Sequence, residues 1–430
     1  MSERRIRDRI PYIKLPSYVK KALKMFEDNG FEAYVVGGAV RDLLRGDEKI
    51  NDYDITTNAL PEETKRVFLG YMIYETGIKH GTVTVNFEGN MLEITTFRTD
   101  GEYTDSRHPD KVTFTRNITE DLARRDFTVN AMALSLDRTL VDPFGGVYDL
   151  ADSIICAVGD PEKRFTEDAL RIMRAFRFSA KLCYEIEEET LSAARKCANG
   201  LKNISRERIG VEWEKLLTSQ FCSRALTDMR DCGIFNVLFP SLQVCPELPK
   251  LVEAMPNDYA ARCAAFFKSV SVEELAAVAE RICLKNVDMN AIKGILTALS
   301  QIRQQKNEHT SIFCYEHRVY AYYSAMIAAL EGSADWDFCN RVKDTLAGGL
   351  SINSRADLAL VGDDLINAGV SDRSILSPVF SVIIRRILVG QLENEKTAII
   401  NDLPSILDEI DADRKSDPIG WRKSNKYSIK

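Results

Sequence analysis

Hydrophobic and polar residues follow a mixed pattern up to about residue 150. Apolar residues recur with a helical period from Pro16 to Glu27, and Gly30 ends this predicted helix. Short apolar or alternating segments, typical of β-strands, come after it. They are residues 34–36, 53–56, 82–87 and 92–97. Strands with few helices between them predict a small mixed β-sheet covered by helices.

The strand pattern ends near residue 150, and helical periods take its place. Gly, Pro and Asn separate the successive amphipathic segments. The predicted helices span residues 167–181, 205–218, 257–268, 272–283, 288–303, 317–331, 335–348, 371–390 and 394–410. The predicted fold class is therefore α+β, with a small mixed β-sheet head followed by an all-α remainder.

The composition narrows the class of protein. The chain has 430 residues, of which 45% are hydrophobic and 28% charged, which suggests several domains and excludes a disordered or fibrous protein. No apolar run reaches the roughly 18 residues of a membrane-spanning helix, and residues 1–14 lack the apolar segment of a secretory signal. The ten cysteines form no C-x-x-C motif and the four histidines no H-x-x-x-H motif. We therefore expect reduced thiols, no zinc site and a cytoplasmic location.

The charge leaves nucleic acid open as a partner. The net charge of −7 argues weakly against it. However, residues 1–20 and 412–430 each carry six Lys and Arg against two acidic residues. Local basic patches, and not the total charge, contact phosphates.

Residues 35–57 hold the densest group of chemically useful side chains. A predicted strand leads into Gly37 and Gly38, and a helix begins directly after them. Paired glycines let a backbone approach a phosphate, and the amino end of the following helix supplies N–H donors. Arg41, in the first turn of this helix, is placed to point at the same phosphates.

Two carboxylates follow on the next predicted strand. Asp52 and Asp54 are alternate residues, so they project from one face about 7 Å apart along the chain. Hard oxygen ligands at this spacing suit Mg²⁺. The alternative is a glycine turn beside solvated acids on an edge strand. A D-x-D pattern alone favours that alternative, but a glycine pair separated from Asp52 by only thirteen residues favours a site.

A second group lies in residues 167–171, with the sequence E-D-A-L-R. We expect this segment to begin a helix with Thr166 as its N-cap, so that Asp168 and Arg171 share one face. A carboxylate accepts hydrogen bonds and a guanidinium donates them, which matches the exocyclic amine and the adjacent ring nitrogen of cytosine or adenine. Uracil and guanine present the opposite polarity, and each unpaired buried group costs about 1–3 kcal/mol. The alternative is an ordinary Asp–Arg ion pair on a solvated helix face.

The glycine and aspartate motif resembles the signature of the polymerase-β-like nucleotidyltransferase superfamily, in which two aspartates hold the metals. Three further stretches resemble successive motifs of the class II tRNA nucleotidyltransferases, the CCA-adding enzymes. They are FRTDGEYTDSRHPDKVTF (97–114), RRDFTVNAMA (124–133) and GDPEKRFTEDALRIMRAFRF (159–178). The resemblance implies template-independent addition of C, C and A to the 3′ end of tRNA from CTP and ATP, with Mg²⁺ as cofactor.

The resemblance implies that Asp52 and Asp54 are catalytic and hold the metal. Glu93, on a predicted strand, is either a third catalytic carboxylate beside them or a half-exposed strand residue. Both interpretations of Glu93 stay open.

The family motifs also imply a set of nucleotide-binding residues. In RRDFTVNAMA, Arg125 is assigned to the nucleotide or its triphosphate and Asn130 to the ribose, and Asp126 is expected to orient Arg125 by a charge-assisted hydrogen bond. Asp168 and Arg171 are expected to select the base. The complete set is Gly37, Gly38, Arg41, Arg125, Asp126, Asn130, Asp168, Arg171, Arg174 and Arg177, of which the last two are expected to face the triphosphate or the tRNA end.

The resemblance divides the chain into four expected segments. They are a nucleotidyltransferase catalytic head (1–150), a helical neck with the nucleotide-selecting helix (151–215), a helical body (216–310) and a helical tail that binds tRNA (311–430). The tail residues expected to contact phosphates are Trp421, Arg422, Lys423 and Lys426. We expect tRNA, CTP and ATP as partners and no membrane, and the oligomeric state stays open.

Three alternatives stay open at this point. The first is a sister activity of the same family, either poly(A) addition or the addition of CC or A alone. The loop at residues 99–110 favours full CCA addition, because CC-adding relatives lack it. The second is a non-catalytic RNA-binding module, and the third is nucleotidyl transfer to a small molecule or a protein. The third alternative does not explain the Asp168 and Arg171 pair, which matches the hydrogen-bonding groups of cytosine and adenine.

Overall fold

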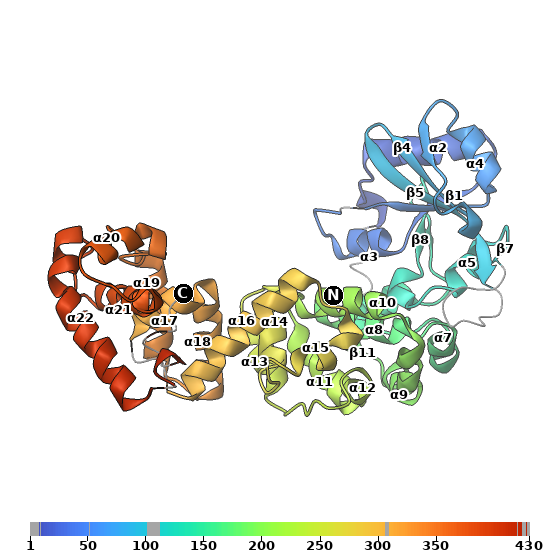
Figure 1. Cartoon of the computed structure of the whole chain (residues 1–430). Coiled ribbons are helices and arrows are strands. Elements are labelled where there is room, and N and C mark those ends of the chain that lie inside the picture. Colours follow the sequence, from blue (N-terminus) through green and yellow to red (C-terminus); the bar gives the residue numbers. More distant parts are fainter. Residues whose placement is uncertain are drawn as a thin grey trace. The chain divides into compact units, whose positions relative to one another are not determined.

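The computed structural model describes residues 8, 10–50, 52–100, 112–305, 309–418, 420–423 and 427. The chain forms two compact units, residues 1–253 with 277–284 and residues 254–276 with 285–430. Figure 1 traces the chain from the blue sheet of the first unit to the red C-terminal helices of the second. The predicted fold class is confirmed, because a mixed-sheet head is followed by helices. The four expected segments stay a prediction.

A seven-stranded sheet in the order β3-β4-β5-β2-β1-β8-β9 forms the head. β2 and β5 are parallel and the other neighbours are antiparallel, so the sheet is mixed as predicted. All four predicted strands are confirmed with small shifts at their ends. The strands are β1 (Ala33–Val36), β2 (Asp54–Thr57), β3 (Met72–Tyr74), β4 (Thr82–Phe87), β5 (Asn90–Thr96), β8 (Ala133–Leu134) and β9 (Leu140–Val141).

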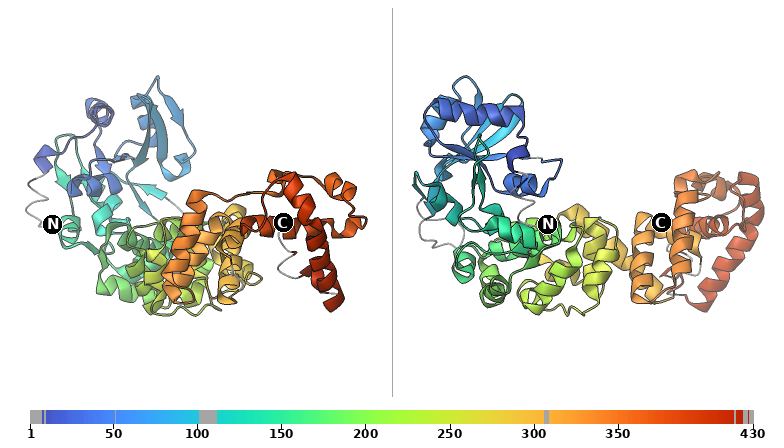
Figure 2. Two further views of the ribbon diagram at one scale, coloured as in Figure 1. Left: turned by 90° about the vertical axis from the view of Figure 1, so that its left-hand side faces the viewer. Right: turned by 180° about the vertical axis from the view of Figure 1, so that it is seen from behind.

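Alternation along the strands gives the sheet one buried face. Val83, Val85 and Phe87 of β4 are buried, whereas the residues between them are only half-buried. The predicted N-terminal helix is confirmed as α2 (Ser17–Asp28), and it packs on this face (Figure 2). Phe26 of α2 stacks edge-on against Phe68, and Phe68 against Phe87, each with ring centroids 5.5 Å apart. Buried aromatic area of this kind dominates the stability of a core.

The rest of the first unit is mostly helical. The predicted helix at 205–218 is confirmed as α10, and the one predicted at 167–181 is confirmed as α8, which begins three residues later, at Leu170. β10 (Ile154–Ile155) and β11 (Glu185–Ile186) pair in parallel, so strands do not end near residue 150 as predicted. Strands of two residues are too short to show an alternating pattern. The other elements are α3 (Gly38–Arg45), α4 (Pro61–Val67), η2 (Ile78–His80), β6 (Arg98–Asp100), β7 (Val112–Phe114), α5 (Ile118–Ala123), η3 (Thr128–Asn130), α6 (Gly146–Asp152), α7 (Pro161–Glu167), α8 (Leu170–Leu182), α9 (Glu188–Cys197), α10 (Arg206–Leu217), α11 (Cys222–Asp231), α12 (Ile234–Leu238) and α13 (Leu248–Ala254).

All regular secondary structure among the described residues of the second unit is helical. Gly294 lets α16 approach α18 closely, because a Cβ there would lie 2.4 Å from the Tyr320 ring. No helix of the described ranges is long and apolar enough to cross a bilayer. The ten cysteines, all within described residues, are free thiols as expected. The helices are α14 (Tyr259–Phe266), α15 (Leu275–Val278), α16 (Asn286–Arg303), α17 (Thr310–His317), α18 (Val319–Glu331), α19 (Trp336–Gly348), α20 (Gly362–Asn367), α21 (Leu376–Leu388) and α22 (Lys396–Ser416).

Candidate active site

The glycine turn predicted at residues 37 and 38 joins β1 to α3. Gly37 has a φ of 70°, a conformation in which any other residue is strained. A Cβ on Gly37 would also lie 3.1 Å from Nη1 of Arg125. Glycine therefore meets two needs here, because it permits the turn and leaves room for a guanidinium group.

The strand register brings carboxylates to this turn. Val36, the last residue of β1, is paired with Asp54 at the start of β2, and Asp54 is paired with Glu93 on β5. Asp52 and Asp54 are exposed, whereas Tyr53 between them is buried. The alternation in exposure predicted for the two aspartates is confirmed, but Asp52 precedes β2 and only Asp54 lies on the strand. The glycine turn directly follows Val36, the residue opposite Asp54.

Desolvation and nearby negative charge perturb Asp54. Although the residue is exposed by its accessible surface, the protein atoms around its carboxyl group desolvate that group and raise its pKa, and the charges of Glu93 and Asp52 raise it further. The positive charge of Arg125 lowers the pKa of Asp54, but it does not cancel these increases. Since a bound cation relieves repulsion between like charges, the arrangement favours a metal ion.

Asp52 and Asp54 fit a divalent cation with oxygen ligands. Mg²⁺ is commonly bound by one or two carboxylates together with substrate phosphates. Within the described part of the chain, no group of three or more Asp, Glu, His or Cys side chains could hold a metal ion by itself. The two aspartates therefore suit a metal whose remaining ligands come from a phosphate substrate, and Glu93 acts through its charge on Asp54.

Arg125 lies near both the glycine turn and Asp54. Burial lowers the pKa of its guanidinium group, and the charges of Asp121 and Asp126 oppose this shift. Its Nη2 lies 3.6 Å from Asp121 Oδ2, and its buried Nε has no hydrogen-bond partner among the described residues. A guanidinium with unused donors is suited to a phosphate group.

A buried polar network connects α3, η3 and α8. Arg41 Nη1 donates to Asn130 Oδ1 (2.7 Å), and Asn130 Nδ2 donates to Asp126 Oδ1 (3.3 Å). Arg174 Nε donates to the other oxygen of Asp126 (2.8 Å). Burial raises the pKa of Asp126, but the charge and hydrogen bond of Arg174 outweigh it and lower that pKa below its ordinary value. The expected bond from Asp126 to Arg125 is wrong, because α8 places Arg174 against this carboxylate.

Three guanidinium groups gather around the ring of Phe178 on α8. The Cζ atoms of Arg41, Arg174 and Arg177 lie 5.3, 5.4 and 4.0 Å from the ring centroid. Glu212 on α10 pairs with Arg177 at 2.6 Å and with Arg174 at 3.9 Å. Asp42 also pairs with Arg41 Nε at 2.8 Å, so three carboxylates offset the three guanidinium groups. Guanidinium groups that are held in place in this way are suited to donate to an anionic ligand such as a triphosphate.

The segment around Asp168 differs from the prediction. α7 ends at Glu167, α8 begins at Leu170, and Asp168 between them is extended, with φ −144° and ψ 101°. Its Oδ1 accepts from the Leu170 N–H (3.0 Å), and its Oδ2 accepts from Arg208 Nη2 on α10 (2.7 Å). A single helix with Thr166 as its N-cap is therefore wrong. The Asp168 carboxylate itself bonds the first turn of α8 and interrupts the helix.

Arg171 is held by a different set of partners. Its Nη1 donates to Glu167 Oε2 (2.9 Å) and to the Arg164 carbonyl (3.2 Å), and its Nη2 donates to the Arg124 carbonyl (3.1 Å). The prediction that Asp168 and Arg171 share one helix face is wrong, and so is the alternative of an ion pair between them. Each group is satisfied by other protein atoms. A bound base would have to replace Arg208 at Asp168 and some of these acceptors at Arg171.

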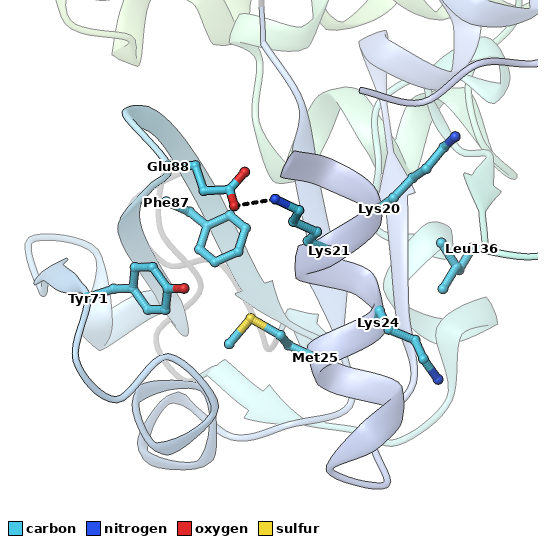
Figure 3. A pocket seen from close by; sticks show the side chains of 8 residues that line it. All are labelled: Lys20, Lys21, Lys24, Met25, Tyr71, Phe87, Glu88 and Leu136. Carbon is cyan, nitrogen blue, oxygen red and sulfur yellow. Dashed lines mark hydrogen bonds and ion pairs between the residues drawn. The ribbon is translucent and has the colours of Figure 1, made fainter. Parts of the chain in front are cut away.

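A hollow of about 530 Å³ lies elsewhere on the first unit, and Figure 3 shows its side chains. Across it, Lys21 Nζ pairs with Glu88 Oε1 at 2.5 Å. The lining residues are Lys20, Lys21, Lys24, Met25, Tyr71, Phe87, Glu88 and Leu136. None of the predicted metal or nucleotide residues lines this hollow, so we do not assign it to the reaction.

Two residues that form ion pairs with the predicted site residues were not predicted from the sequence. Arg208 and Glu212 are four apart on α10, and each pairs with a predicted site residue on another element. Glu212 could have been found from the sequence, because it lies on the same side of the helix as the apolar residues Ile209 and Trp213 and is therefore expected to be buried. A buried carboxylate needs a charged partner, which could have pointed to the arginines of α8.

The expected tail contacts are only partly described. Trp421 is buried and packs edge-on against Tyr427, with ring centroids 5.4 Å apart, so its expected contact with RNA is wrong. It belongs to the hydrophobic core around α21 and α22. Arg422 is exposed. The side chains of Lys423 and Lys426 lie outside the described residues, and so does most of the loop at 99–110.

Two protein-family models match parts of the chain. The model described as "Poly A polymerase head domain" matches residues 33–156. The model described as "Probable RNA and SrmB- binding site of polymerase A" matches residues 183–245.

Individual relatives match most of the chain. The CCA-adding enzyme of Geobacillus kaustophilus (strain HTA426) is 37% identical over 383 residues, which cover 88% of this chain and 94% of the relative. That of Ligilactobacillus salivarius (strain UCC118) is 36% identical over 413 residues, which cover 92% and 98%. The crystal structure of the Bacillus stearothermophilus CCA-adding enzyme in complex with CTP is similar, with a TM-score of 0.75 and 33% identity, over 93% of this chain and 98% of that one.

The perturbed pKa of Asp54 predicts how stability depends on pH. Because folding raises this pKa, the stability that the carboxyl group contributes is present below its ordinary value of 3.8 and is lost as pH rises through the folded-state pKa. Without added metal, Asp54→Asn should therefore unfold at higher urea concentration than the parent at pH 7, and this advantage should vanish at low pH. Glu189→Gln, an exposed change on α9, should match the parent within about 0.5 kcal/mol at both pH values. A less stable Asp54→Asn at pH 7 would contradict the crowding of charge.

Proposed function

Because this chain belongs to the CCA-adding enzyme family, we propose that it adds C, C and A to the 3′ end of tRNA from CTP and ATP without a template. The observation that carries the mechanism is the register of the sheet. It sets the exposed pair Asp52 and Asp54 beside a glycine turn, next to Glu93 and Arg125. Acidic and basic groups at one turn suit the transfer of a nucleotide from its triphosphate.

Asp52 and Asp54 are proposed to hold Mg²⁺ together with phosphate oxygens of the substrate. Bound there, Mg²⁺ would help the 3′-hydroxyl of tRNA attack the α-phosphate and stabilise the charge that develops on pyrophosphate. The charge of Glu93 on Asp54 strengthens the preference for a cation at this position. The metal assignment stays a proposal.

The triphosphate is proposed to lie against the guanidinium groups near the glycine turn. Arg125 has an unused buried donor, and Arg41 is held in place by Asn130. Arg174 and Arg177 add positive charge on α8. Because each of these groups is fixed by a carboxylate, an amide or an aromatic ring, little ordering remains when the substrate binds.

Asp168 and Arg171 are proposed to select the base. Asp168 Oδ1 would continue to accept the hydrogen bond from the Leu170 N–H. Asp168 Oδ2 would release Arg208 and accept a hydrogen bond from the exocyclic amine of the base. Arg171 donates to the adjacent ring nitrogen. Cytosine and adenine replace the displaced protein partners with equivalent hydrogen bonds. Uracil and guanine would leave both groups unpaired, at about 1–3 kcal/mol each.

Two related proposals concern the rest of the molecule. Residues 311–430 are proposed to bind tRNA, and the cytoplasm is the proposed location, where tRNA ends are completed.

The alternative activity is poly(A) addition or partial addition of CC or A. Poly(A) addition remains an alternative because the family model that matches residues 33–156 describes a poly(A) polymerase head domain. The length and sequence of the product distinguish these activities.

Replacement of Asp52 tests the proposed chemistry. Asp52→Ala should reduce incorporation of labelled CTP into tRNA lacking its CCA end by at least about a thousandfold, because it removes a metal ligand. Its urea unfolding midpoint should stay close to that of the parent, since the side chain is exposed. Asp28→Ala, exposed on α2, should keep parental activity. Incorporation at the parental rate by Asp52→Ala would contradict the metal assignment.

Replacement of Arg171 tests base selection. Arg171→Ala should lower kcat/KM for CTP and ATP by about 5- to 150-fold, the equivalent of one lost buried hydrogen bond. It should also lower the ratio of kcat/KM for CTP to kcat/KM for UTP. Lys163→Ala, exposed on the preceding helix α7, is the matched control and should keep both. If Arg171→Ala discriminated between CTP and UTP as well as the parent, base selection by Arg171 would be wrong.

A further inference from the structure

The open face of the sheet continues from the candidate site across β5, β4 and β3. Along one row, Asp54 is paired with Glu93, Glu93 with Thr84, and Thr84 with Tyr74. Residues paired in register project from the same face, so Tyr74 shares the face that carries the carboxylates. Three steps of about 4.8 Å between neighbouring strands place the Cα of Tyr74 roughly 14 Å from that of Asp54.

A second row beside the first carries two methionines. Met72 on β3 and Met91 on β5 are both paired with Asn86 on β4. Met72, Tyr74 and Met91 are 61%, 41% and 55% exposed. Tyr74 Oη lies 2.8 Å from Met72 Sδ, which holds these two side chains together. We call Met72, Tyr74 and Met91 the open-face platform.

The core of the head does not need this platform. The alternate residues Val85 and Leu92, which face the other way, are completely buried. Exposed apolar and aromatic side chains gathered on one face typically mark a binding surface. The platform therefore has a use outside the packing of the sheet.

We infer that the open-face platform binds the unpaired 3′ end of the RNA acceptor, with a base stacked on Tyr74. This inference rests on the proposed function, because only then is a 3′-hydroxyl brought to Asp52 and Asp54. The nucleotides behind the reacting end must then lie near the site, and the platform is continuous with it on the same face. Lys79, exposed on η2 shortly after β3, adds positive charge for the RNA backbone.

The chemistry of the platform suits an end that changes with every addition. The acceptor ends in a different nucleotide after each of the three steps. Stacking on an aromatic ring tolerates any base, because every base has a π-face, and thioether side chains adapt their shape. Hydrogen-bond readout at this position would instead favour one of the three intermediates.

The first experiment measures steady-state CTP incorporation as a function of acceptor concentration. Tyr74→Ala should raise the KM for the acceptor by about 5- to 150-fold, the loss expected for one base–aromatic stack. The KM for CTP and the kcat at saturating acceptor should stay within about twofold of the parent. Tyr74→Phe keeps the ring and should behave as the parent. Leu69→Ala, which removes an 86% exposed side chain outside both rows, is the matched control and should also behave as the parent.

The second experiment removes the base in place of the ring. We compare an intact acceptor with one that carries an abasic sugar one or two positions before its 3′ end. The parent should bind the abasic acceptor more weakly than the intact one. Tyr74→Ala should bind the two acceptors equally well, because the ring on which the base stacks is already missing. Equal acceptor KM values for the parent and Tyr74→Ala, in an active parent, would overturn the inference. So would a dimer that Tyr74→Ala dissociates with unchanged acceptor KM, because β3 is an edge strand and a second copy would then be the occupant. A parent that incorporates no nucleotide would instead contradict the proposed function.

Discussion

The ion pair between the buried Asp126 and the partly exposed Arg174 fixes the geometry on which the site depends. Asp126 directly precedes the segment that leads back into the sheet, and Arg174 lies on α8, which also carries Arg171. Removing Arg174 would leave the buried Asp126 carboxylate without its charged partner, which destabilises the folded protein. The pair therefore holds α8 at one distance from the catalytic strands. Under the proposed function, a nucleotide whose base binds at the start of α8 would extend its α-phosphate toward Asp52 and Asp54.

Two groups of like charges lie at the candidate site. The carboxylates of β2 and β5 repel one another, and three guanidinium groups gather around Phe178, each close to a carboxylate partner. Under the proposed function, a cation would relieve the repulsion between the carboxylates and a triphosphate would bind the guanidinium groups. Such local strain is typical of functional sites, where stability is given up for binding.

Local periodicity explains which elements the sequence predicts well. The strand at 82–87 and the alternation of Asp52 and Asp54 depend on adjacent residues, and both are confirmed. The break at Asp168 was missed because helical period and capping compete there, and the cap prevails. The partners Arg208 and Glu212 lie far along the chain from the groups they hold, so only the tertiary structure reveals them. For the same reason the burial of Trp421 could not be anticipated from a basic tail.

The most direct test of the proposed function is to incubate the purified protein and Mg²⁺ with all four nucleoside triphosphates and tRNA truncated before its CCA end, and then to sequence the product ends. We expect two cytidines followed by one adenosine, with no uridine or guanosine and no further growth. A long tract of adenosine, the incorporation of uridine or guanosine, or an unchanged tRNA end would contradict it.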